Sequence, residues 1–298
     1  MLRTRSRILA LALLVALAAL LAGYGHLEAQ GEAVESKIIQ LSQTDNQVMR
    51  WNDYASNRFG GRETGSNAYN DATEWAVWQF KQWGIEAELD EVGSVPVGFN
   101  RGPWFGKMLT PVEKPLRFGT PSYTAGTRGV QRGKVSILEA DPFVINGRNA
   151  TPENVEKKRL LVEQAISEVK ASPARFKDTW VLIGGLNDGF ARDGRRGSKL
   201  PDGSPEYLDA AMMPPLTKAL VEAGALGTIQ SATPPSPIQP DRNSEPPINI
   251  LDGFVASWDT LPVLPDIKLL NTQFSEIRTL VEKGEPVVLE FDIRNWFT

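Results

Sequence analysis

The stretch FGGRETGS, residues 59–66, lies directly before a run of residues with helical periodicity. Ser66 is a suitable N-cap, and Gly84 is a suitable left-handed C-terminal stop for a helix between them. One face of this helix would carry the apolar residues Tyr69, Ala72, Ala76, Phe80 and Trp83. We expect these side chains to pack in a core. The next stretch, IEAELDEV at 85–92, alternates apolar and acidic residues, which predicts a strand. Helix, glycine stop and strand predict an α/β domain.

Further helices and strands are predicted before and after residues 59–92. Apolar residues at helical spacing predict a leading helix over 34–56. From residue 96 to 265 the chain is rich in proline, glycine and short apolar runs. Three of these runs predict buried strands: GKVSILEA from Gly133, TWVLIGGL from Thr179 and GALGTIQSA from Gly224. We expect two helices here, one starting at Thr151 as N-cap with Pro152 in the first helical position, and one over 216–223.

The last segment, 266–298, returns to a helix followed by a strand. NTQFSEIRTLVEKGE, at 271–285, predicts a helix that stops at Gly284. PVVLEFDIRNWF, at 286–297, alternates and would direct Leu289, Phe291 and Ile293 inward. We expect a fold of class α/β, in which a β-rich α+β segment over 96–265 interrupts the α/β part.

The first 29 residues have the features of a secretory signal peptide. Arg3, Arg5 and Arg7 precede the apolar stretch ILALALLVALAALLA at 8–22, and small residues occur near Ala29. The apolar stretch is short for a membrane span, although an uncleaved anchor stays an alternative. We expect a secreted or periplasmic protein that has no membrane association after signal cleavage. The chain has no cysteine, so its fold uses no disulfide.

Charge and composition exclude several classes of function. Without the leader the chain has 29 basic and 35 acidic residues, a net charge of −6, which argues against nucleic acid as a partner. Its only histidine, His26, lies in the leader. The mature chain therefore lacks the histidine or cysteine of Ser-His-Asp and Cys-His catalysis, and the usual zinc ligands.

We assign no catalytic, cofactor-binding or metal-binding residue, because the remaining site patterns in the sequence are weak. Asp188, Asp193 and Asp202 occur in a glycine-rich stretch, but their spacing does not match a calcium loop, and we expect a solvated surface loop. IGGLNDG, at 183–189, lacks the glycine order of a nucleotide-binding turn. A Ser-Lys pair around Ser66 or Ser136 stays open.

One aromatic group also leaves two interpretations. Phe99, Trp104 and Phe105 could form an aromatic patch over a substrate cleft. Packing of the 96–265 segment onto the rest of the protein is the alternative that we favour.

Several of these segments together resemble one enzyme family. NRFGGRETGS at 57–66, FKQWG at 80–84 and IEAELDEV resemble the start of the secreted two-zinc exopeptidases, the aminopeptidase group that includes plasma glutamate carboxypeptidase. Arg62, Thr64, Gly65 and Ser66 match the residues that open the first helix of that peptidase domain. ALVEAGALGTI, from Ala219, resembles an element of the protease-associated domain inserted in that family. LPVLPDI and VVLEFDIRN, at 261–267 and 287–295, resemble the return into the peptidase sheet.

The resemblance implies a division of the chain and a function. Residues 1–29 would be the signal peptide, 30–95 the start of the peptidase-like domain, 96–265 a protease-associated insert, and 266–298 a truncated return to the peptidase-like domain. The full-length family member binds zinc and hydrolyses peptide substrates, but its zinc ligands lie beyond the part that matches here. This chain would then bind no zinc and be inactive alone, with the insert shaping substrate access.

Two expectations and one alternative follow from this division. The insert should fold by itself, whereas Leu289, Phe291 and Ile293 should lack neighbouring strands to cover them. The alternative is a stand-alone protease-associated module that binds peptides or partner proteins without catalysis. The oligomeric state is not predicted by any pattern in the sequence.

Overall fold

A computed structural model describes residues 33–142, 151–187, 208–232 and 257–298, which divide into two units at Gly60. In the first unit, residues 33–44 form one helix and α2 (Val48–Phe59) another, so the single leading helix predicted over 34–56 is wrong. The break occurs where the Asn46 Oδ1 accepts a hydrogen bond from the Val48 backbone N–H, 3.0 Å away. Asparagine makes this local bond readily, and it competes with continuation of a helix.

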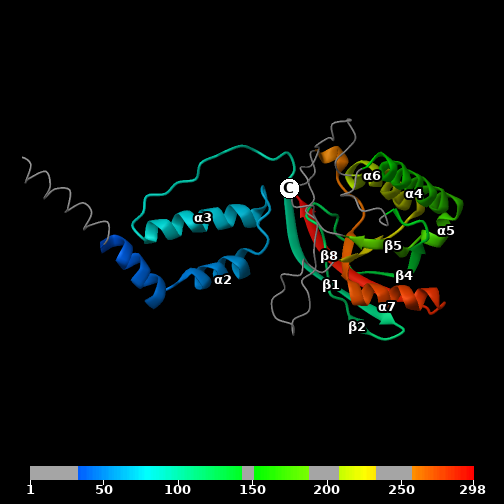
Figure 1. Cartoon of the computed structure of the whole chain (residues 1–298), viewed down its shortest axis with the longest axis horizontal. Coiled ribbons are helices and arrows are strands. Elements are labelled where there is room, and N and C mark those ends of the chain that lie inside the picture. The colour runs from blue at the N-terminus through cyan, green and yellow to red at the C-terminus, as the bar shows by residue number, and fades with distance from the viewer. Residues whose placement is uncertain (1–32, 143–150, 188–207, 233–256) are drawn as a thin grey trace, which may run out of the picture. The chain divides into compact units, whose positions relative to one another are not determined.

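The second unit, Gly61–Thr298, contains the sheet and the remaining helices (Figure 1). Its helices are α3 (Asn67–Gln82), α4 (Pro152–Ala171), α5 (Pro173–Phe176), α6 (Leu208–Ala223) and α7 (Asn271–Glu282). Its strands are β1 (Phe99–Thr110), β2 (Lys114–Pro115), β3 (Phe118–Gly119), β4 (Gln131–Leu138), β5 (Thr179–Asn187), β6 (Gly227–Ala232), β7 (Asp266–Leu270) and β8 (Val288–Phe297). A mixed α/β fold is therefore confirmed.

The eight strands form one sheet in the order β2-β1-β8-β4-β5-β6-β7-β3. Strands β4 to β7 are parallel neighbours, as expected where helices connect successive strands. Strand β8 lies antiparallel between β1 and β4. Thus β7 and β8, which follow residue 265, belong to the same sheet as the strands that precede it. The domain boundaries given above stay predictions.

This central position of β8 overturns one expectation. Leu289, Phe291 and Ile293 are directed inward as predicted, but each is 0% exposed, so the expectation that they lack cover is wrong. Their neighbours are β1 on one side and β4 on the other, both from the segment predicted as an insert. A fragment that ends at residue 265 would lack β7 and β8. We therefore expect the independently folding unit to extend to residue 298.

Two helical layers enclose the sheet (Figure 1). Helix α7 packs through Phe274 and Ile277 onto one face, where the core includes Trp180 and Phe291. Helices α4, α5 and α6 cover the opposite face and share a core with Val181 of β5. Apolar side chains alternate between these two cores along β5, as the period of a strand covered on both faces requires.

The helix ends follow the local signals in the sequence. Ser66 caps α3 by accepting a 3.0 Å hydrogen bond from the Tyr69 N–H, and Thr151 caps α4 in the same way. Gly84, Gly224 and Gly284 have φ values of 75° to 81°, the left-handed conformation that ends a helix at glycine. Helix α6 starts at Leu208, earlier than predicted, and passes through Pro214 and Pro215.

Two predictions around α3 are wrong. Residues 85–92 form no strand, since no strand of the described chain pairs with them. Among the aromatic residues of α3, Tyr69, Phe80 and Trp83 are 40–51% exposed rather than packed in a core. In contrast, β1 was not predicted, because glycine and proline at Gly102 and Pro103 interrupt its alternation. The register shift between Arg101 and Trp104 accommodates this interruption as a bulge.

Candidate functional site

The opening stretch lies against the ends of two strands of the sheet. Ser66 is 1% exposed, and its backbone N–H donates to the Glu63 carbonyl at 2.9 Å. The next residue, Asn67, donates its backbone N–H to Oδ1 of Asn100 in β1, also at 2.9 Å. Because the first N–H groups of a helix have no intrahelical partner, these two bonds satisfy donors that would otherwise need water. The start of α3 is thus bonded to a strand 33 positions along the chain.

Asn100 joins the start of α3 to the last residue of the chain. It is 3% exposed, and its Nδ2 donates to the Thr298 Oγ1 at 3.1 Å. Beside it, Gly98 and Thr298 exchange two backbone hydrogen bonds of 2.7 and 3.0 Å. We call this group, Ser66, Asn67, Gly98, Asn100 and Thr298, the clasp. Asn100 occupies its centre with both functional atoms of its amide bonded.

Glycine is required on both sides of the clasp. Gly65 has φ +78°, and a Cβ there would lie 2.1 Å from the Val95 Cγ2. A Cβ on Gly98 would lie 2.4 Å from the Gly65 carbonyl oxygen and 2.6 Å from the Thr298 Oγ1. The two backbones therefore approach more closely than any side chain permits. This contact explains why the opening stretch carries a glycine directly before the N-cap serine.

Tyr123 contacts the residues next to the clasp through both its ring and its hydroxyl. Its ring stacks on Phe99 at a centroid distance of 5.3 Å, and its hydroxyl donates to the Thr64 carbonyl at 3.4 Å. Its φ of 55° is rare for a bulky residue. Burial, together with the nearby Glu63 carboxylate, raises the pKa of the Tyr123 phenol, which therefore stays protonated at neutral pH.

The second polar group lies on β8. Glu290 and Asp292 are each 3% exposed and project from the same face of the strand. Glu290 accepts from Arg132 and lies 3.6 Å from the Lys107 Nζ, whereas Asp292 pairs with Arg294 at 3.0 Å. The hydrogen bond from Arg132 lowers the pKa of Glu290. An ionised, paired carboxylate of this kind is not prepared to transfer a proton at neutral pH.

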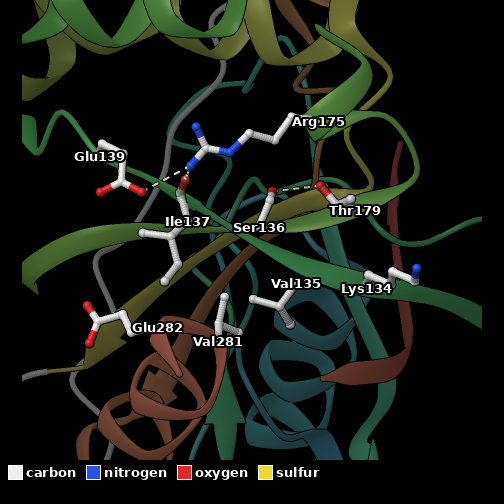
Figure 2. A pocket seen from close by; sticks show the side chains of 9 residues that line it. All are labelled: Lys134, Val135, Ser136, Ile137, Glu139, Arg175, Thr179, Val281 and Glu282. Carbon is white, nitrogen blue, oxygen red and sulfur yellow. Dashed lines mark hydrogen bonds and ion pairs between the residues drawn. The ribbon is translucent and has the colours of Figure 1, made fainter. Parts of the chain in front are cut away.

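A shallow cavity of about 490 Å³ lies where β4 extends past the start of β8 (Figure 2). Inside it, Thr179 donates to the Phe176 carbonyl at 2.9 Å, so the 2.8 Å bond between Thr179 and Ser136 uses the Ser136 proton. The Lys134 side chain extends away from Ser136 (Figure 2). The cavity therefore does not bring a Ser-Lys pair together. Ser66, the other serine considered, has the capping role described above.

Arg175 closes the same cavity on one side. Its guanidinium donates to the Ile137 carbonyl and to Glu139 and Glu168, the latter two at 3.2 and 2.9 Å. These bonds lie at the end of β4 that does not pair with β8, and they protect this strand edge from pairing with another chain. The polar groups around this cavity are thus engaged in hydrogen bonds and ion pairs that stabilise the fold.

The three aromatic residues do not form one patch. Phe99 is 0% exposed in the small core with Tyr123, whereas Trp104 and Phe105 are 39% and 46% exposed. As consecutive residues of β1, Trp104 and Phe105 project from opposite faces of the strand. Asp188, Asp193 and Asp202 lie outside the described residues.

The described residues do not fit a zinc centre. Within them, no three His, Cys, Asp or Glu side chains lie close enough together to hold a metal ion. Buried Glu290 and Asp292 have arginine partners instead. No helix in the described ranges is long and apolar enough to cross a bilayer.

Sequence reasoning missed the clasp and the ion pairs of β8. The acidic residues of β8 carry a usable signal, since a carboxylate in a buried strand needs a cationic partner or hydrogen-bond donors. Asn100 carries none, because its partners lie far away in the chain.

Comparison with known proteins identifies distant structural neighbours. No protein-family model matches the chain, and no curated protein matches it. A solved structure of a peptidase M28 precursor from Shewanella amazonensis SB2B is 15% identical with a TM-score of 0.43, and the alignment covers 89% of this chain and 50% of that one. An aminopeptidase from Aneurinibacillus sp. strain AM-1 is 11% identical with a TM-score of 0.35, covering 78% and 42%. A zinc aminopeptidase from Bacillus subtilis is 11% identical with a TM-score of 0.34, covering 82% and 41%. The chain spans half the length of these proteins or less.

Proposed function

We propose that this chain is the N-terminal, non-catalytic portion of an exported metal-dependent exopeptidase. In this proposal α3 and residues 85–92 start the peptidase domain, and a protease-associated insert shapes access for peptide substrates. Because β7 and β8 belong to the same sheet as β1 to β6, the proposal extends this insert past the predicted boundary at residue 265. Residues 1–29 act as the signal peptide, and the mature protein is secreted or periplasmic.

One observation carries the proposal, namely the contrast between the sheet and α3. Helices pack on both faces of the sheet, and Trp180 and Phe291 in its core are 0% exposed, although Trp104, Phe105 and Trp296 on β1 and β8 are 39–46% exposed. Helix α3 has one buried residue, Gln79, while Trp78, Phe80 and Trp83 are 42–56% exposed. Ile85 and Leu89 of the following segment are 51% and 57% exposed. Phe80 and Trp83, whose rings lie 5.7 Å apart, form an exposed aromatic pair, and exposed apolar surface of this kind favours an interaction site. A peptidase sheet packed on α3, with 85–92 as one of its strands, would cover it.

The chemistry of the donors supports the proposal that catalysis belongs to another part of the protein. Two-metal hydrolysis needs ligands that hold two ions about 3.5–4 Å apart. The described residues do not supply such a group, and the mature chain has neither histidine nor cysteine. Zinc, where the full-length protein binds it, would be held by residues outside this chain. We therefore expect the isolated chain to hydrolyse no peptide.

The exposed aromatic residues also favour one alternative. A stand-alone protease-associated module could bind peptides or a partner protein through an exposed aromatic residue of β1, Trp104 on one face or Phe105 on the other, without catalysis. In that case residues 85–95 would be part of the module and would pack against it. The two functions thus predict different behaviour for residues 85–95.

Two measurements test the proposal. Purified chain 30–298 is first assayed on short unblocked peptides, with zinc added and then chelated, and we expect no turnover in either state. Turnover that the chelator abolishes would overturn the assignment of catalysis to another part of the protein. Limited proteolysis then separates the alternatives. The exopeptidase proposal predicts early cleavage within 85–95, because no strand of the described chain pairs with residues 85–92, whereas protection of 85–95 would favour the module.

The gene provides an independent check. A reading frame that continues past codon 298 into a His-x-Asp stretch would support the exopeptidase. A stop codon at that position would contradict it.

A further inference from the structure

We propose that Asn100 is a positioning residue that fixes the start of α3 to the strand ends of the sheet. This inference rests on the function proposed above. There, α3 opens the peptidase domain and the sheet forms the insert, so the clasp would set the angle at which the insert covers the substrate site.

The bonding pattern of Asn100 singles it out. Its Oδ1 accepts from the Asn67 N–H at 2.9 Å, and its Nδ2 donates to the Thr298 Oγ1 at 3.1 Å. The first bond reaches the helix, and the second reaches the end of β8. A single buried amide therefore connects three segments that are far apart in the chain. Removal of this amide leaves the Asn67 N–H without its partner in a partly buried site.

The close backbone approach makes the connection stiff. Gly98 lies between Asn100 and the opening stretch, and it has no room for a Cβ on the side of Gly65. Thr298 is held to Gly98 by two backbone bonds. Interfaces packed this tightly move as discrete units rather than bending. Rotation of α3 about its start would therefore have to break the Asn67 bond to Asn100.

The other hydrogen bond described between the opening stretch and the residues that follow β1 is longer than those of Asn100. Gln79 is the one residue of α3 that is buried. The hydroxyl of Tyr123 reaches the Thr64 carbonyl at 3.4 Å, longer than the bonds of Asn100. The clasp is thus the shortest set of described hydrogen bonds between the opening of α3 and the sheet.

The test measures the orientation of α3 directly. Since the chain has no cysteine, spin labels can be placed cleanly at Glu74→Cys on α3 and Lys170→Cys on α4 in the full chain, both exposed positions. The parent protein should give one narrow distance distribution. Asn100→Leu should broaden it at least about twofold in width. It should also accelerate amide exchange of Asn67 by about tenfold or more.

Two further variants distinguish positioning from general destabilisation. Asn100→Asp keeps an acceptor for the Asn67 N–H, places a charge that the helix N-terminus favours, and can accept from the Thr298 hydroxyl. It should keep the narrow distribution. Asn295→Leu is the matched control, because Asn295 lies in β8 next to Arg101 and bonds the Thr124 carbonyl instead of the clasp. It should also leave the distribution narrow.

A distribution for Asn100→Leu as narrow as the parent would overturn the proposal. So would broadening in Asn100→Asp equal to that in Asn100→Leu, or a broad distribution in the parent itself. None of these results depends on catalysis. The exopeptidase proposal fails separately, through zinc-dependent turnover by this chain or a stop codon after residue 298.

Discussion

Substitution of Phe291 by alanine tests the central position of β8. The ring is 0% exposed and lies edge-on to two other rings, Phe118 at 5.1 Å and Trp180 at 4.8 Å. Loss of a buried phenylalanine costs about 3–5 kcal/mol. Two aromatic contacts, each worth about 0.5–1.5 kcal/mol, place this residue toward the upper end of that range.

The surroundings of Phe291 also limit relaxation after the substitution. The ring covers Gly106 of β1, where a Cβ would lie 2.5 Å from two ring carbons. Glycine has no side chain that could fill the space left by the ring, so the cavity should persist. We expect Phe291→Ala to lower the free energy of unfolding by about 4–5 kcal/mol. For a unit of this size, that loss lowers the melting temperature by about 8–20 °C.

The assay is thermal and urea unfolding of the full chain, with Phe105→Ala as the control. Phe105 is in the neighbouring strand and 46% exposed, and we expect its loss to cost about 1 kcal/mol or less. If Phe291→Ala destabilises the chain no more than Phe105→Ala does, β8 is not a central strand. The argument that β1 and β4 cover β8 from both sides would then be refuted.

Three further substitutions test local features. Glu290→Gln removes a carboxylate whose pKa is lowered by its hydrogen bond from Arg132. Because the pKa is lower in the folded protein, the ionised carboxylate stabilises the fold at pH values above the ordinary pKa of about 4.3. This contribution to stability is lost as the pH falls through the lowered pKa of the folded protein. Urea unfolding from pH 6 to 2 should show a smaller loss of stability in the variant than in the parent. Gly98→Ala should cost about 1–3 kcal/mol through overpacking, whereas Gly61→Ala, with nothing within 4 Å of the new Cβ, should change stability little. Ser66→Ala should cost about 1 kcal/mol by loss of the cap, and amide exchange in the first turn of α3 should accelerate.

Helix boundaries were predictable because their causes are local. The Ser66 hydroxyl bonds the N–H of Tyr69, three residues away, and Gly84 ends the same helix through its own φ of 75°. Neither feature depends on what surrounds the helix. Thr151, followed by Pro152, determines the start of α4 in the same way.

The strands, in contrast, depend on partners that are distant in the chain. Strand β1 carries Gly102 and Pro103, which break its alternation, yet it forms because β8 pairs with it from Phe99 to Thr110. The bulge after Arg101 accommodates the two residues without loss of the ladder on either side. Long-range pairing therefore outweighs the local preference of these residues against strand structure.

The clasp was not predictable for a related reason. Asn100 bonds one residue 33 positions before it and another 198 positions after it. An asparagine in a strand gives no indication of either partner. The close approach of Gly65 to Gly98 is equally invisible in the sequence, although a glycine directly before an N-cap serine indicates that the backbone there needs unusual freedom.

The same alternating pattern has opposite outcomes at 85–92 and 286–297, and the difference supports the proposed division of the protein. The later segment finds β1 and β4 as neighbours, and its inward residues are fully buried. The earlier one has no pairing strand in the described chain, and Leu89 stays 57% exposed. A strand buries its apolar face only when other strands satisfy its backbone groups. In the proposed function, the earlier segment and the amphipathic helix before it would join a second sheet. The clasp lies where that sheet and the one in this chain would meet.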